Sequence, residues 1–143
     1  FPPVTDSMLQ DPDPSDWLMW RRTLDSWGYS PLDEVNRDNV DQLRMVWTHG
    51  LATGTGEITP LAYNGMLYVP QHNDVIEAID ARTGDQVWEY GRDHPEGLYD
   101  YVGVNARNNR NLAIFENLII NTSDDGFVFA LDAQTGETVW ETA

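Results

Sequence analysis

A thirteen-residue segment near the middle of this chain occurs again at its C-terminal end. Residues 78–90, AIDARTGDQVWEY, match residues 130–142, ALDAQTGETVWET, at eight of thirteen positions with an offset of 52. The register also holds outside this core, since Val75-Ile76 falls on Phe127-Val128 without an insertion. A unit of about 40–50 residues that is used twice and built from short strands is typical of a β-propeller blade or a similar array. Two units do not close a ring, so we expect the chain to be part of a larger structure.

Turn signals divide each unit into four short strands. For the first unit we expect strands at 58–63, 66–70, 75–80 and 86–90. For the second unit we expect strands at 112–115, 118–121, 127–131 and 138–141. Asn64-Gly65 joins the first two strands, and this dipeptide accepts the positive φ angles of a tight hairpin turn. The sequence therefore predicts an all-β chain with two four-stranded antiparallel propeller blades.

Each copy of the repeat contains an Asp-Ala-x-Thr-Gly turn followed by a tryptophan. Asp80 and Asp132 begin these turns, where a carboxylate can accept hydrogen bonds from nearby backbone N–H groups. The glycine of each turn can take the left-handed conformation that the turn needs. Trp88 and Trp140 fall in the middle of the last strand of each unit, and we expect them to pack between neighbouring blades.

The repeat and its surroundings divide the chain into five segments. Residues 1–16 form an extended N-terminal arm, and residues 17–57 form a lead-in segment that includes the strand of a closing blade. Residues 58–90 are the first blade, residues 91–111 a long loop, and residues 112–143 the second blade. The loop is polar, departs from the repeat and holds three of the eight basic residues of the chain. Because function concentrates in loops of this kind, we expect the loop to carry functional residues.

The charge balance excludes some classes of partner. The chain has 24 acidic and 8 basic residues, a net charge of −16, and no basic stripe that could neutralise nucleic-acid phosphates. No apolar run approaches the roughly 18 residues of a transmembrane segment. The sequence begins with Phe1 rather than Met, which we interpret as an exported, periplasmic protein whose signal peptide has been removed.

The repeat resembles a known family. Ala-x-Asp-Ala-x-Thr-Gly-x-x-Val-Trp-Glu is similar to the tryptophan-docking motif of quinoprotein dehydrogenases, the PQQ-dependent alcohol and methanol dehydrogenases. The lead-in segment, from Trp27 through Tyr29-Ser30-Pro31-Leu32 to Trp47, resembles the N-terminal signature of the same family. The resemblance implies the N-terminal portion of an eight-bladed propeller enzyme. It implies an alcohol as substrate, a cytochrome c as electron acceptor, and contact with the remainder of the propeller.

The same resemblance implies two cofactor-binding residues. Glu57, in Gly-Glu-Ile-Thr-Pro-Leu, matches a glutamate that hydrogen-bonds the quinone in the family. Arg110, in Asn-Arg-Asn-Leu-Ala, resembles an arginine that contacts a PQQ carboxylate. The chemistry agrees, because PQQ carries three carboxylates and a guanidinium group pairs with a carboxylate through two hydrogen bonds.

The chain also departs from the family pattern. Many members have adjacent cysteines five and six residues before this arginine, where Val104 and Asn105 stand here, and the chain contains no cysteine. The catalytic aspartate and the ligands of the calcium or lanthanide ion lie in later blades of the family. We therefore place no catalytic and no metal-binding residue in this chain, and expect it to be inactive alone. His49, His72 and His94 lack metal-site spacing and are interpreted as ordinary residues.

Two alternative interpretations stay open. The first is a non-enzymatic propeller with PQQ-like repeats that acts as a binding scaffold and takes up no cofactor. The second is a non-catalytic fragment that pairs its open strand edges with other copies of itself. The first alternative predicts no effect of PQQ on stability, and the second predicts a mass that is a multiple of 16.3 kDa.

Overall fold

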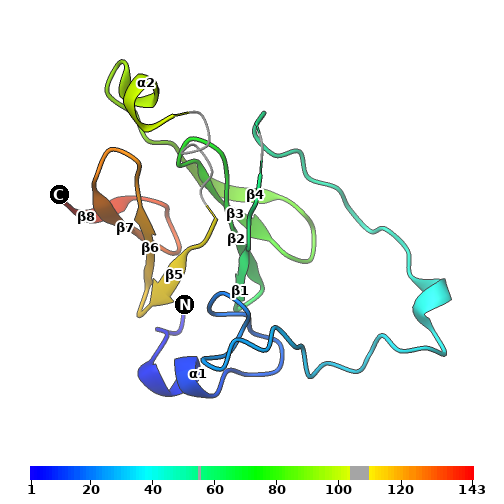
Figure 1. The fold of residues 1–143 in the computed structure, drawn as a ribbon. Coiled ribbons are helices and arrows are strands. Elements are labelled where there is room, and N and C mark those ends of the chain that lie inside the picture. Colours follow the sequence, from blue (N-terminus) through cyan, green and yellow to red (C-terminus); the bar gives the residue numbers. More distant parts are fainter. Residues whose placement is uncertain (55, 104–109) are drawn as a thin grey trace.

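The computed structural model describes residues 1–54, 56–103 and 110–143. These residues form two four-stranded antiparallel sheets with the strand orders β1-β2-β3-β4 and β5-β6-β7-β8 (Figure 1). The first sheet contains β1 (Leu61–Tyr63), β2 (Met66–Pro70), β3 (Ile76–Asp80) and β4 (Gln86–Tyr90). The second contains β5 (Ala113–Phe115), β6 (Leu118–Thr122), β7 (Val128–Asp132) and β8 (Thr138–Thr142). The prediction of an all-β chain with two four-stranded antiparallel blades is confirmed.

The two sheets repeat each other in backbone detail. The register of β3 against β4 shifts between Ala78 and Ile79, and that of β7 against β8 shifts between Ala130 and Leu131. A shift of this kind increases the local twist of a sheet, so both sheets are twisted at the same point. The repeat in the sequence is therefore a repeat in three-dimensional structure.

The predicted turn chemistry is also present. One carboxylate oxygen of Asp80 accepts hydrogen bonds from the backbone N–H groups two and three residues later, at 2.8 and 3.2 Å. Asp132 makes the same two hydrogen bonds at 2.9 and 3.0 Å. Gly84 and Gly136 adopt φ angles of 78° and 74° four residues after each aspartate, where a side chain would add backbone strain.

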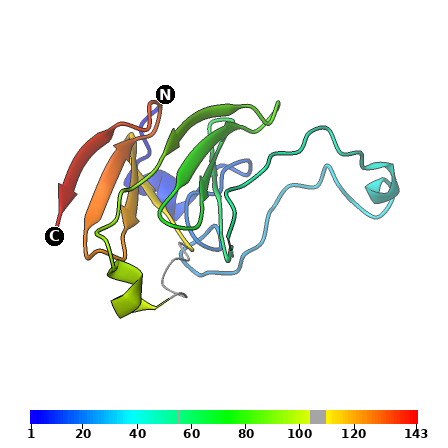
Figure 2. The ribbon, with the colours of Figure 1, turned by 90° about the horizontal axis from the view of Figure 1, so that it is seen from above.

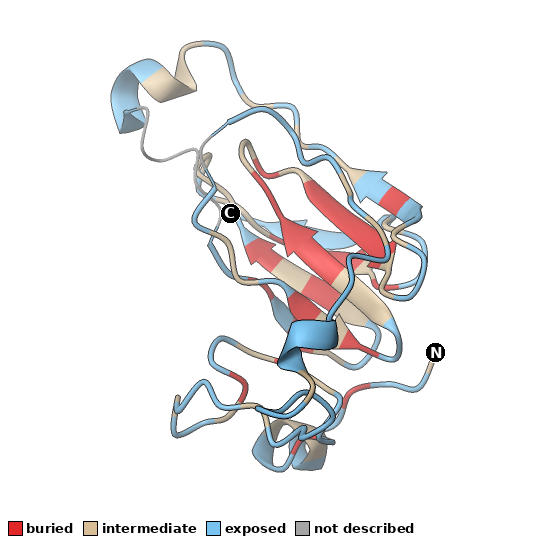
Figure 3. Ribbon diagram, turned by 90° about the vertical axis from the view of Figure 1, so that its right-hand side faces the viewer, coloured by how far each residue is buried: buried red, intermediate tan, exposed pale blue. Residues whose placement is uncertain are grey.

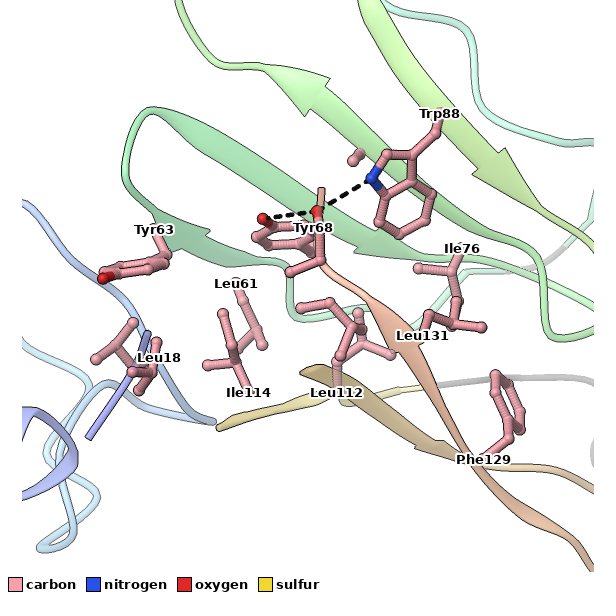
Figure 4. Close-up of a cluster of buried hydrophobic side chains, with 14 residues drawn as sticks. Leu18, Leu61, Tyr63, Tyr68, Ile76, Trp88, Leu112, Ile114, Phe129 and Leu131 are labelled. Carbon is pink, nitrogen blue, oxygen red and sulfur yellow. Dashed lines mark hydrogen bonds between the residues drawn. The ribbon is translucent and has the colours of Figure 1, made fainter. Parts of the chain in front are cut away.

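The hydrophobic core lies between the two sheets, where buried strands face each other (Figures 3 and 4). Its largest fully buried side chains include Tyr68, Phe129, Leu61, Ile76, Ile119 and Leu131. Trp88 is 8% exposed and packs in this core, which confirms its predicted place between blades. Trp140 is 38% exposed on the outer side of the second sheet, and no neighbouring blade covers it among the described residues. Apolar burial between the sheets therefore holds the pair together.

The N-terminal arm is not simply extended, as the sequence suggested. It contains the helix α1 (Asp6–Gln10), whose first turn is capped by the side chain of Thr5. Val4 is fully buried and forms an antiparallel bridge with Glu116 next to β5, while Trp17 forms a bridge with Ala62 of β1. The arm and the start of the lead-in segment thus pair with both sheets.

The lead-in segment is mostly irregular chain. The short 3₁₀ helix η1 (Val40–Gln42) is followed by irregular chain, and no strand forms in the described residues between 43 and 60. The segment makes separate contacts with the first sheet, such as the hydrogen bond from the Trp47 indole to Ala81, but no ladder of backbone hydrogen bonds with the described residues. Because a strand needs such a ladder, the strand of a closing blade stays a prediction. In Figure 2 the part of the lead-in segment around η1 extends away from the two sheets before the chain returns to them, and Met45 and Val46 in this segment are 81% and 84% exposed.

One further helix, α2 (Leu98–Val102), lies in the loop between the blades. The described part of the chain contains no helix of the length and apolar character that crossing a bilayer requires. The helix α2 lies at one end of the sheets, as Figure 1 shows, and the site described next also lies at a sheet end.

Candidate functional site

The two predicted cofactor ligands lie at the sheet end where β1 and β5 begin. Glu57 precedes β1 by four residues and Arg110 precedes β5 by three. The backbone N–H of Thr59 donates a 2.9 Å hydrogen bond to the carbonyl oxygen of Arg110, so the two approaching segments run beside each other. The equivalent position of the two strands in their sheets is what brings these distant residues together.

Glu57 and Arg110 form an ion pair. The Nε and Nη2 atoms of Arg110 each lie 2.8 Å from the same carboxylate oxygen of Glu57. The two side chains are 61% and 56% exposed, so water screens the pair and its contribution to folding is small. More than half of each side chain remains accessible to a ligand, which is what a binding role requires.

A small cavity of mixed lining is bordered by the two chain neighbours of Glu57, Gly56 and Ile58. It has a volume of about 90 Å³ and is lined by Leu51, Ala52, Gly54, Gly56, Ile58, Gln71 and His72. The Nε2 atom of Gln71 and the Nδ1 atom of His72 are buried without a hydrogen-bond partner among the described residues. Because unpaired buried polar atoms are costly, these atoms are suited to meet a polar group or water that enters the site.

The chain approaches itself closely at this cavity. A Cβ atom placed on Gly54 would lie 2.6 Å from the His72 ring. Only glycine lets the lead-in segment pass this close to the turn between β2 and β3. The turn itself carries two non-glycine residues with positive φ, Asn73 at 60° and Asp74 at 55°, so its backbone is strained at the same end of the sheet.

A second polar cluster braces the loop between the blades. The Nε2 atom of His94 lies 3.0 Å from Asp74, and these side chains are only 9% and 6% exposed. The Nδ1 atom of His94 lies 3.3 Å from the hydroxyl of Tyr99 in α2, and Ser123 lies 3.4 Å from Nε2. Asp74 and Ser123 meet the same imidazole nitrogen, so this cluster is not a serine–histidine–aspartate triad, in which they would meet opposite nitrogens.

Arg92 ties the same loop to the second sheet. Its Nε atom lies 2.8 Å from Asp125 and its Nη1 atom 3.0 Å from Glu141, and the guanidinium stands over the ring of Phe127 at 4.9 Å. Burial acts to raise the pKa of Asp125. Hydrogen bonds from Arg92, Ser123 and the backbone together lower the pKa by more than burial raises it, so the pKa lies below its ordinary value. The loop is therefore held at Arg92 and His94 before it continues toward Arg110.

The residues present are compatible with a ligand that carries several carboxylates. Arg110 can donate to a carboxylate, Glu57 can accept from an N–H or O–H group, and Gln71, whose Nε2 group has no partner among the described residues, lines the adjacent cavity. Among the described residues, no group of three or more His, Asp or Glu side chains is arranged to hold a metal ion. Val104 and Asn105, which stand at the cysteine positions of the resemblance, lie outside the described residues.

Sequence reasoning identified Glu57 and Arg110 but missed the cluster around His94. The structure places His94 in a buried pair with Asp74, and His49 in contact with Glu77 at 2.9 Å, although neither contact follows from sequence spacing. The one available signal was the position of His94 in the loop that departs from the repeat. Asp74 lies in a turn and Glu77 in β3, 20 and 28 residues away from their histidines.

Comparison with known proteins gives a consistent result. Residues 17–142 match the family model described as "PQQ: Glucose/ethanol/alcohol dehydrogenase, beta-propeller domain". The chain is 37% identical over 131 residues to the dehydrogenase subunit of a quinone-dependent alcohol dehydrogenase from Gluconacetobacter polyoxogenes, with 91% of this chain and 18% of the relative covered. It is also 37% identical over 117 residues to 1-butanol dehydrogenase (cytochrome c) from Thauera butanivorans, with 79% and 16% covered.

Two solved structures resemble this one along nearly its whole length. Quinohemoprotein alcohol dehydrogenase ADHIIG from Pseudomonas putida HK5 superimposes with a TM-score of 0.86 at 30% identity, covering 97% of this chain and 21% of that protein. A europium-containing methanol dehydrogenase superimposes with a TM-score of 0.80 at 27% identity, covering 96% and 25%. The chain thus spans between about a sixth and a quarter of the length of these proteins.

Proposed function

Because the chain belongs to the PQQ β-propeller family of glucose, ethanol and alcohol dehydrogenases, we propose that it is the N-terminal part of a PQQ-dependent alcohol dehydrogenase. The relatives named above are alcohol dehydrogenases, and the chain corresponds to a minor part of each of them. The remainder of the propeller supplies the other groups of the active site. The chain alone is inactive in this proposal.

In this proposal Glu57 and Arg110 bind PQQ. The single observation that carries the assignment is their ion pair, formed at the start of β1 and β5 while both side chains stay open to solvent. Arg110 would hold a carboxylate of the cofactor and Glu57 would accept a hydrogen bond from its ring system. PQQ, when bound, serves as the acceptor of the hydride from the alcohol.

A metal ion completes the proposed enzyme. We assign calcium or a lanthanide, with ligands outside this chain, because the similar methanol dehydrogenase contains europium. Such an ion acts as a Lewis acid on an oxygen of the bound cofactor or substrate. A cytochrome c is the proposed electron acceptor, in agreement with the name of the Thauera butanivorans relative.

The PQQ affinity of the full-length protein tests the assignment. Equilibrium dialysis of the cofactor-free protein against PQQ compares the wild type with Arg110→Lys and Glu57→Gln. Loss of a bidentate arginine contact is expected to weaken binding roughly tenfold or more. Arg44→Lys is the matched control, because Arg44 lies in the exposed lead-in segment and, within the described part of the chain, its side chain donates only to nearby carbonyl groups. Equal affinities for all variants would contradict the assigned roles, and absence of PQQ binding by the wild type would favour a scaffold without cofactor.

The periplasm is the proposed location, as the resemblance to exported dehydrogenases implies. Fractionation of cells that produce the complete protein tests this independently of PQQ. Recovery with periplasmic markers is expected, whereas recovery with cytoplasmic markers would contradict the proposal.

A further inference from the structure

Two segments of this chain dock on sheets through the same anchor. The indole nitrogen of Trp88 donates to the carbonyl oxygen of Ala133 at 3.1 Å, in the Asp-Ala-x-Thr-Gly turn of the second sheet. The indole nitrogen of Trp47, in the lead-in segment, donates to the carbonyl oxygen of Ala81 at 3.1 Å, in the same turn of the first sheet. The lead-in segment therefore occupies the place on the first sheet that β4 occupies on the second.

The contact of each indole ring is also the same. A Cβ atom placed on Gly84 would lie 2.6 Å from the Trp47 ring, and one on Gly136 would lie 2.7 Å from the Trp88 ring. The tryptophan anchor is thus identical at the two interfaces. By itself it cannot distinguish which segment belongs on which sheet.

The interfaces differ two residues after the tryptophan. At the second sheet, Tyr90 stacks on Phe129 of β7 with 5.1 Å between ring centroids. At the first sheet, the equivalent residues are His49 and Glu77 of β3, and the imidazole Nε2 lies 2.9 Å from the carboxylate. An aromatic pair at one interface is replaced by a polar pair at the other.

The polar pair is buried. The side chain of Glu77 is 5% exposed and that of His49 is 16% exposed. The Nδ1 atom of His49 lies 3.1 Å from the carbonyl oxygen of Gly84, which only accepts hydrogen bonds, so Nδ1 must donate. A carboxylate or carboxyl group buried at this position without a partner would be strongly unfavourable.

The two interfaces also differ four residues after the tryptophan. Arg92 forms an ion pair with Glu141 at the second sheet. Leu51 and Glu89 stand at the equivalent positions of the first sheet, and both are exposed. If residues 88–92 docked on the first sheet instead of the second, Tyr90 would lose its contact with Phe129. Its phenol ring would then face Glu77.

We propose that His49 and Glu77 form a recognition pair that assigns the Trp47 segment to the first sheet. The surface around Glu77 fits a segment with the pattern tryptophan-x-histidine, and the surface around Phe129 fits tryptophan-x-aromatic. A histidine facing Phe129 would bury an imidazole nitrogen without a partner, and a tyrosine facing Glu77 has one O–H group and cannot serve both Glu77 and the Gly84 carbonyl as His49 does. Both wrong dockings are therefore disfavoured. The tryptophan supplies the affinity common to both interfaces, and the residue two positions later supplies the specificity.

A double-mutant cycle in the full-length protein tests this proposal through denaturant unfolding. His49→Tyr and Glu77→Phe are each expected to raise the unfolding equilibrium constant roughly 100-fold, because each leaves a buried polar partner unpaired. The combined variant recreates the pair of the second interface and is expected to return within roughly tenfold of the wild type. Additive effects of the two substitutions would overturn the proposal.

A second cycle avoids the larger side chains in case Glu77→Phe does not fold. Glu77→Ala and His49→Ala remove the two partners without adding bulk, and a coupling of at least roughly tenfold in the unfolding constant is expected. Glu89→Ala is the matched control, since Glu89 is paired with Glu77 across β3 and β4 but is exposed. Coupling of His49 to Glu89 as strong as to Glu77, or no coupling to Glu77, would refute the recognition pair. None of these outcomes depends on PQQ.

Discussion

The indole N–H of Trp88 donates to the carbonyl oxygen of Ala133, and this bond links the last strand of the first sheet to a turn of the second. The hydroxyl of Tyr68 donates to the same oxygen at 3.1 Å. Burial raises the pKa of Tyr68, and the charge of Asp132 acts in the same direction, so the phenol stays protonated as a donor. One carbonyl oxygen thus receives two donors from the neighbouring blade.

Two substitutions of Trp88 are expected to destabilise the protein to different extents. Trp88→Phe removes the hydrogen bond and part of the ring, with an expected loss of about 1–2 kcal/mol. Trp88→Ala also leaves a cavity between the sheets and should cost about 3–5 kcal/mol. Denaturant unfolding measures both. Trp27→Phe is the control, because Trp27 is 76% exposed, and a comparable loss there would contradict the role of the inter-sheet bond.

Gly136→Ala is expected to be more harmful than Gly126→Ala. Both glycines have positive φ, at 74° and 89°, so each alanine should cost about 1–2 kcal/mol in backbone strain. At Gly136 the new methyl group would also lie 2.7 Å from the Trp88 ring, whereas at Gly126 no atom of the described residues lies within 4 Å. The clash should add about 1–3 kcal/mol. Equal losses in unfolding free energy would show that the ring contact has no energetic weight.

Acid should remove the stabilisation that Arg92 gives through Asp125. The pKa of Asp125 is lower in the folded protein than its ordinary value, so the stabilisation is present above the unfolded pKa of about 3.9 and disappears as the pH falls through the folded pKa. Wild type should therefore exceed Asp125→Asn in stability near neutral pH, and the difference should shrink as the pH falls below about 4. Unfolding at several pH values checks this. The exposed Asp33→Asn control should show little difference at any pH, and a constant gap for Asp125→Asn would contradict the ionic origin.

Glu57→Gln and Arg110→Lys should leave stability nearly unchanged. Because their ion pair is more than half exposed, each substitution is expected to change the unfolding free energy by less than about 1 kcal/mol. A small effect on stability combined with weaker PQQ binding would separate a ligand role from a structural one. A large loss of stability would instead indicate that the pair mainly connects β1 to β5.

Most of the fold prediction came from the repeat in the sequence. Turns headed by Asp80 and Asp132 make the same local hydrogen bonds, and such local interactions can be inferred from the residues that make them. The lead-in strand of a closing blade stays a prediction, since a strand depends on a partner that sequence patterning does not supply. The helix α1 was missed because its five residues carry no periodic apolar face.

The cofactor role of Glu57 and Arg110 rests on the family resemblance and stays a prediction. Glu57 and Arg110 were named from sequence, and their contact follows from the matching places of β1 and β5 in the two blades. The pairs of His94 with Asp74 and of His49 with Glu77 join segments from outside the repeat to turns and strands within it. Such pairs depend on the path of irregular chain, which no period describes.

The two sheets are held to each other and to the N-terminal arm near both their outer strands and their inner strands. Trp88 reaches Ala133 from the outer strand β4, while Val4 pairs with Glu116 beside the inner strand β5 and Trp17 pairs with Ala62 of β1. Attachment at both the outer and inner edges leaves little freedom to change the wedge angle between the blades. A circular arrangement closes only when its wedge angles add up to a full turn. The contacts of the first two blades therefore already restrict how many blades the finished ring can hold.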